Sequence, residues 1–147
     1  MFQAYEKPSG SGTVLFRRPI ETVGFAGISP DGKSFAMGSA TSDSVEIVDA
    51  TTGVVRDRIV VPGRGIAQAA AWAPDGEALY VSGVLMDPRY WIRKIPLTAT
   101  GSAEVLWSSE DVWAGNPVPS PDGTKLSFQT RELRTELWRL DLPSRAR

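Results

Sequence analysis

Three aspartates recur at equivalent points of the sequence: Asp31, Asp75 and Asp122. Each stands in a Pro-Asp-Gly step, and these steps are 44 and 47 residues apart. Carboxylates brought together by a repeat can bind a cation or a basic partner. Turn chemistry alone explains the same spacing, because proline presets φ, aspartate accepts bonds from nearby amides and glycine adopts a positive φ. We therefore expect these aspartates to shape turns rather than to form a ring of ligands.

Other residues that commonly perform chemistry are missing. The chain of 147 residues has no cysteine and no histidine. This excludes thiolate nucleophiles, Ser-His-Asp and Cys-His systems and nearly all zinc sites. Neither a phosphate-binding glycine loop nor a G-x-S-x-G nucleophile elbow occurs in the sequence. We expect a protein that is not an enzyme and that holds no metal or other cofactor.

The aromatic residues offer one candidate binding site. Trp72 and Trp91 fall on expected strands, where packing between sheets is the simpler role. Trp113 differs because its segment, Val112-Trp113-Ala114-Gly115-Asn116, leads from one expected repeat into the next. Segments that connect repeats often meet ligands. We therefore take Trp113 and Asn116 as a candidate partner-binding loop, with packing as the competing interpretation for Trp113.

Charge and hydropathy narrow the class of partner. The 16 basic and 17 acidic residues give a net charge of −1 with no basic patch, which argues against nucleic acid. No segment has the roughly 18–20 apolar residues that span a bilayer, so we expect no membrane insertion. The first residues lack the basic and apolar regions of a signal peptide. We expect a soluble chain, cytoplasmic or periplasmic, with a protein or small-ligand partner that the sequence does not identify.

The elements around the aspartates are short strands. Apolar residues stand five and seven positions after each proline, with another residue between them: Phe35 and Met37, Leu79 and Val81, Leu126 and Phe128. Period-two alternation predicts a strand with one face more buried than the other. Each copy therefore predicts a strand, a tight turn and a second strand, which is a β-hairpin.

These hairpins belong to longer repeats. Expected strands lie near residues 2–7, 13–17, 23–28, 34–39, 44–49, 54–61, 66–72, 78–83, 90–95, 103–107, 113–118, 125–130 and 135–142. Residues 131–140 also place Leu133, Leu137 and Leu140 on one helical face, but their position in the repeat favours a strand. A unit of 40–50 residues with four short antiparallel strands is typical of a β-propeller blade.

The predicted fold class is therefore all-β, a single propeller segment over residues 1–147. Residues 1–19 end an upstream blade, 20–62 and 63–110 form two blades, and 111–147 form a blade that lacks its outer strand. Closed propellers typically have about 4–8 blades, so three blades and a leading half-blade predict an incomplete propeller. Exposed blade faces and strand edges then favour self-association, unless the chain is a fragment of a longer one.

The repeats also resemble a known family. The S/A-P-D-G turn, followed by strands such as "VEIVDATTG" and "ELWRLDLP", resembles the WD-repeat-like propeller repeats of the TolB-like class. The first repeat is also similar to surface-layer and cytochrome-like propellers. The stretch "VWAGNPVPSPDGTKLSFQTRELRTELWRL" resembles the closing blade of propellers at the C-terminus of multidomain bacterial regulators. The resemblance implies a propeller fold that hosts many functions.

Two functions follow as expectations. The first is a non-catalytic propeller module, a scaffold for protein interaction or ligand sensing, which the regulator resemblance would place in the C-terminal part of a larger bacterial regulator. The alternative is a part of the gating propeller of a prolyl-oligopeptidase-type serine peptidase whose catalytic domain is absent here. The reading frame on either side of the chain discriminates between them.

Overall fold

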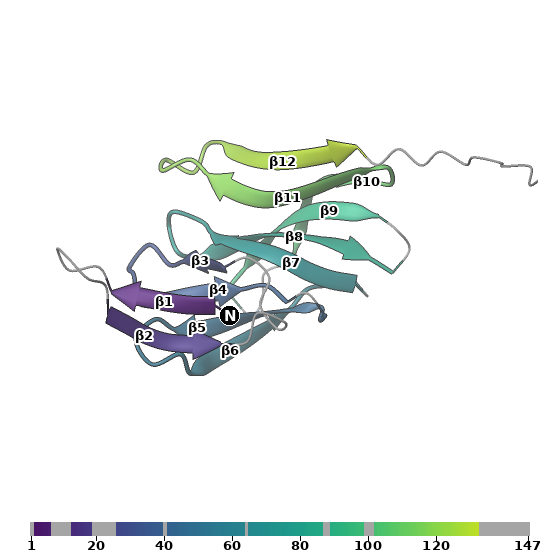
Figure 1. The fold of residues 1–147 in the computed structure, drawn as a ribbon. Coiled ribbons are helices and arrows are strands. Elements are labelled where there is room, and N and C mark those ends of the chain that lie inside the picture. The colour runs from purple at the N-terminus through teal and green to yellow at the C-terminus, as the bar shows by residue number, and fades with distance from the viewer. Residues whose placement is uncertain are drawn as a thin grey trace, which may run out of the picture.

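The computed structural model describes residues 2–6, 13–18, 26–39, 41–63, 65–86, 89–98 and 102–132. Every regular element in these ranges is a β-strand (Figure 1). The strands are β1 Phe2–Glu6, β2 Thr13–Arg18, β3 Ala26–Ile28, β4 Ser34–Met37, β5 Ser44–Asp49, β6 Val55–Val60, β7 Gly65–Trp72, β8 Ala78–Leu85, β9 Tyr90–Pro96, β10 Glu104–Ser109, β11 Val112–Pro119 and β12 Leu126–Glu132. This confirms the all-β prediction.

The strands form four antiparallel sheets in which sequence neighbours pair. Strands β3 to β6 make one four-stranded sheet, blade 1, and β7 to β10 make another, blade 2. The remaining sheets have two strands each, β1–β2 and β11–β12. In Figure 1 the sheets lie in a stack, with β11–β12 above blade 2, blade 1 below it and β1–β2 at the opposite end from β12. Among the described residues the fold is an incomplete β-propeller with blades of four antiparallel strands.

The Pro-Asp-Gly turns have the predicted geometry. Gly32, Gly76 and Gly123 adopt φ values of 72°, 74° and 70°, a conformation that residues with a β-carbon disfavour. In each turn the glycine N–H donates to the carbonyl three residues earlier, at 2.9 Å. Successive turns also lie side by side, since a β-carbon on Gly76 would be 4.0 Å from the Pro30 ring. The turns therefore follow one rim of the stack, as expected from equivalent positions in a propeller.

The strand after each turn divides its side chains between two neighbouring sheets. In β4, Met37 is buried and clusters with Phe35 and Phe16, the latter from β2. Ala36, between Phe35 and Met37, joins the main core between blades 1 and 2. In β8 the same rule places Leu79 in the main core and Tyr80 against Leu126 of β12. The alternation thus stacks the sheets face to face.

The expected difference between the two faces of a strand is wrong for β8. Leu79, Tyr80 and Val81 are all buried, at 0%, 8% and 0% exposure. Blade 2 has blade 1 on one face and β11–β12 on the other, so both of its faces are covered. The expected difference does hold in β12, where Ser127 is exposed between half-buried Leu126 and Phe128.

Some sequence predictions fall on residues that the structure does not describe. These are the strand near 135–142, its helical alternative and the first half of the strand near 23–28. The division of the chain into blades at residues 20, 63 and 111 stays a prediction. Among the described residues there is no helix that could cross a bilayer.

Candidate functional site

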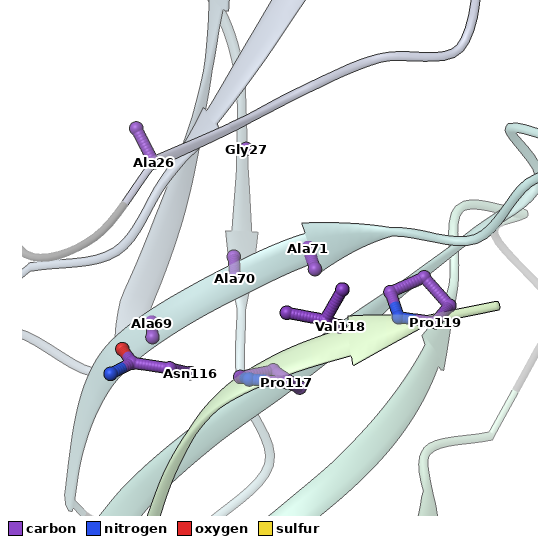
Figure 2. Close-up of a pocket in the computed structure, with 9 residues that line it drawn as sticks. All are labelled: Ala26, Gly27, Ala69, Ala70, Ala71, Asn116, Pro117, Val118 and Pro119. Atoms are coloured by element: carbon purple, nitrogen blue, oxygen red, sulfur yellow. The ribbon is translucent and has the colours of Figure 1, made fainter. Parts of the chain in front are cut away.

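The first strands of three sheets meet at one groove. Strands β3, β7 and β11 line it together, and Figure 2 shows their side chains around it. The cavity volume is about 270 Å³. Its lining consists of Ala26, Gly27, Ala69, Ala70, Ala71, Asn116, Pro117, Val118 and Pro119. All but Asn116 are apolar or lack a side chain, so the groove suits apolar groups.

Small residues create the space. Ala69, Ala70 and Ala71 follow one another on β7 and end at the β-carbon. Gly27 lets β3 approach β7 closely, since a β-carbon there would lie 3.0 Å from the Ala70 carbonyl oxygen. Larger residues at these positions would fill the groove or push blades 1 and 2 apart. The groove therefore depends on side chains that are absent rather than on reactive groups.

A β-bulge in β11 shapes the opposite wall. Gly115 pairs with Gln129 and Val118 with Ser127, so Asn116 and Pro117 together face a single residue of β12. Asn116 has a φ of 52°, a conformation that asparagine tolerates better than most residues. Proline has no N–H to pair and is accommodated in strands at bulges. The bulge presents Val118, which is 59% exposed, at the groove (Figure 2).

Hydrogen bonds hold the residues of this wall. The Asn116 Nδ2 donates to Gln129 Oε1 at 2.9 Å. The Asn116 Oδ1 is buried and has no hydrogen-bond partner within the described part of the chain. Trp113 donates from Nε1 to Gln68 Oε1 of β7 at 3.1 Å, which ties β11 to blade 2. Its ring covers Gly115, where a β-carbon would lie 2.2 Å from the indole.

The predicted partner-binding loop is a strand. Trp113 and Asn116 both lie in β11, and only Asn116 lines the groove. The strand expected near residues 113–118 is confirmed, and only the expectation of a loop there was wrong. A bulge at Asn116 and Pro117 absorbs the extra residue and keeps β11 paired. Whether either residue contacts a partner stays a prediction.

The sequence analysis missed most of the groove. Gln68 is the extra residue of a second bulge, since Ala67 pairs with Gly83 and Ala69 with Ser82. The run of small residues from Ala69 to Ala71 was the available signal, because a strand that packs on both faces rarely lacks bulk at three successive positions. Nothing in the sequence marks Gly27, whose role depends on how two blades approach.

The three aspartates behave as turn residues. Asp31 accepts bonds from the Ser29 hydroxyl at 2.6 Å and the Lys33 N–H at 3.0 Å. The serine bond is the main cause that lowers the pKa of Asp31 below 3.8. The Ser120 hydroxyl lowers the pKa of Asp122 in the same way. Within the described ranges no three acidic side chains gather as metal ligands would.

Comparisons with known proteins bear on the fold. No protein-family model and no curated protein matches the chain. Among solved structures, TolB from Acinetobacter baumannii matches with a TM-score of 0.60 and 24% sequence identity. The match covers 80% of this chain but 29% of the TolB chain. The likeness supports the TolB-like propeller fold and does not extend to function.

Proposed function

We propose that the chain is a non-catalytic propeller module that binds an apolar segment of a partner protein in the groove between β3, β7 and β11. The observation that carries this proposal is the groove itself, where three sheets contribute an apolar lining with a single polar side chain, Asn116. An apolar site of this kind distinguishes ligands by their shape and by the apolar surface they bury rather than by hydrogen bonds or charge.

The size of the groove favours side chains of a peptide over a large cofactor. Its volume of about 270 Å³ lies below the range of roughly 300–1,000 Å³ that is usual for small-molecule sites. Burying one large apolar side chain contributes about 1.5–3 kcal/mol. Two or three such side chains contribute about 3–9 kcal/mol before the cost of ordering the peptide, so the groove alone supports binding no tighter than about the micromolar range.

The non-catalytic part of the proposal rests on the side chains that the chain lacks. Without histidine or cysteine, a hydrolytic site would have to use carboxylates or unusual bases. The side chains around the groove offer neither. Turnover of generic ester, peptide or lactone substrates by the purified chain, well above the uncatalysed rate, would overturn this part.

We also propose that the chain works as part of a larger protein. The groove serves equally in the C-terminal propeller of a bacterial regulator, the context we favour, and in the gating propeller of a serine peptidase. A kinase or DNA-binding domain encoded upstream in the same reading frame supports the first, and a hydrolase domain encoded downstream supports the second.

The groove is tested with peptides selected from a displayed random library against the whole chain. Val118→Asp places a charge in the apolar groove, and we expect it to weaken binding of the selected peptides at least tenfold. Val105→Asp is the matched control, because Val105 is 54% exposed on β10 and lies outside the groove. Selected peptides that bind both variants as tightly as the parent chain would contradict the proposed site.

A further inference from the structure

The two short sheets correspond to different halves of a blade, as the positions of their bulges show. In blades 1 and 2 the third and fourth strands pair with one extra residue on the fourth strand, Arg56 of β6 and Leu106 of β10. The β1–β2 sheet has the same arrangement, with Leu15 of β2 as the extra residue. It therefore matches the outer half of a blade.

The β11–β12 sheet matches the inner half. In blade 2 the first and second strands pair with the extra residue, Gln68, on the first strand. In β11–β12 the extra residue also lies on the first strand, at the Asn116 bulge. The S-P-D-G turn joins β11 to β12, as the equivalent turns join the first two strands of blades 1 and 2. An inner half and an outer half together make one four-stranded blade.

The described residues leave one surface uncovered beside each half. The β1–β2 sheet covers the outer part of blade 1, where the Phe16 ring meets Phe35 at 6.0 Å and lies against Gly53 in the turn after β5. Another part of blade 1 is hollowed, with a volume of about 360 Å³. This hollow, polar apart from one methionine, is lined by Met37, Ser39, Thr41, Ser42, Ser44, Glu46 and Arg58.

The exposed face of β12 is polar too. Leu126 packs against blade 2 and the Phe128 ring lies 5.8 Å from that of Trp107. Side chains alternate along a strand, so Ser127, Gln129 and Arg131 face away from blade 2, and all three are exposed. The hydroxyls and the Glu46–Arg58 ion pair of the hollow, whose charged atoms are 2.8 Å apart, offer hydrogen-bonding partners for such a face.

We propose that two copies of the chain associate head to tail, so that β11–β12 of one copy and β1–β2 of the other form a shared blade. Strand β12 then pairs with β1 of the other copy, and the polar face of β12 covers the hollow of its blade 1. Within its described residues, each copy supplies two complete blades and two halves. Two copies close a ring of six blades, within the range of about 4–8 that propellers adopt.

A second copy fits this role better than the same copy does. Figure 1 shows β12 at the top of the stack and β1–β2 in its lower part beside blade 1, with blade 2 between β12 and β1–β2. A head-to-tail contact that turns each copy by half a circle closes after two copies, whereas a rotation that does not divide a full circle would continue as a filament. This proposal is independent of the partner-binding groove, because neither the residues of β12 nor those that line the hollow of blade 1 line the groove.

The first test is the mass of the whole chain in solution, measured by sedimentation velocity over a wide concentration range. We expect a reversible step from 15.9 kDa to twice that mass and no larger species. A chain that stays at the mass of one copy at the highest concentration overturns the proposal. Growth into longer assemblies overturns the closed ring.

The second test identifies the contact and uses the absence of native cysteine. Ala4→Cys places a thiol on β1 and Gln129→Cys places one on β12. We expect a short thiol-reactive cross-linker to join these two variants efficiently when they are mixed. Thr52→Cys, in the exposed turn after β5, replaces Gln129→Cys in the control and should give no link to Ala4→Cys.

The same chemistry tests the rival occupant of the β12 edge, which is the chain's own segment after Glu132. A double variant with Gln129→Cys and Leu137→Cys would report that segment by a cross-link within one chain. Such a link at high concentration, with no link between the Ala4→Cys and Gln129→Cys chains, overturns the shared blade.

Discussion

At the level of single residues, the three turns show how one sequence motif tolerates variation. Ser29 donates to Asp31, and Ser120 donates to Asp122 at 2.5 Å. Ala73 replaces the serine in the second turn and has no hydroxyl to donate, yet its glycine keeps the same φ and the same 2.9 Å backbone bond. Glycine and the backbone therefore define the turn, and the serine–aspartate pair adds to it.

That addition depends on pH. The hydroxyl bonds hold the pKa of Asp31 and Asp122 below 3.8 in the folded chain. A carboxylate whose folded pKa is depressed contributes stability above its unfolded pKa, and this contribution is lost as the pH falls through the lower folded value. We expect the urea midpoint to fall with acidification below about pH 4. The double variant Ser29→Ala and Ser120→Ala should be less stable than the parent chain at neutral pH, and its urea midpoint should fall less on acidification. Plots of urea midpoint against pH that run parallel for the two proteins would contradict this.

Two glycines separate conformational strain from steric conflict. Gly32 has a φ of 72° and no atom within 4 Å of a β-carbon placed on it, so Gly32→Ala should cost about 1–2 kcal/mol through conformation alone. Gly32→Asn should cost less, because asparagine tolerates this region. Gly38→Ala should cost more than Gly32→Ala, because its β-carbon would lie 2.7 Å from the Gln68 carbonyl oxygen. Urea unfolding of the three variants gives the order, and equal losses would refute it.

At the level of elements, the sequence predicts strands well where local properties decide them. The hairpins after Pro30, Pro74 and Pro121 follow from turn chemistry and alternation, which are local properties. The strand near residues 113–118 was predicted, but its bulge was not, because the partner strand β12 decides where the extra residue is absorbed. Only the run from Ala69 to Ala71 signals the groove in the sequence, since the rest depends on how closely β3 and β7 approach.

A substitution at Trp113 tests how the β11–β12 sheet is joined to blade 2. Trp113→Phe keeps an aromatic ring over Gly115 but removes the bond to Gln68 Oε1. We expect a loss of about 1 kcal/mol in the free energy of unfolding, because the half-buried Gln68 oxygen loses its donor. Adding Gln68→Leu should recover part of it. If Trp113→Phe instead abolishes binding of groove-selected peptides without lowering stability, Trp113 contacts the partner as the sequence first indicated.

At the level of the whole molecule, the stack makes stability uneven. Blade 2 is covered on both faces, whereas each two-stranded sheet has a neighbour on one face only within the described chain. In arrays of repeats, stability is roughly a sum over units and their interfaces with neighbours. The free energy of local opening should therefore be highest in blade 2 and lowest in β1–β2 and β12.

Amide hydrogen exchange measures this gradient, and one core substitution tests its cause. We expect the slowest exchange in β7 to β9 and the fastest in β1, β2 and β12. Leu79 is fully buried in the core between blades 1 and 2, so Leu79→Ala should cost about 2–5 kcal/mol and speed exchange in both blades. Ser127→Ala, on the exposed face of β12, should leave exchange in blade 2 unchanged.

The shared blade adds a second expectation, because pairing between copies would slow exchange in β1 and β12 as concentration rises. Exchange in β1 and β12 that stays constant while the mass doubles would place the contact between copies elsewhere.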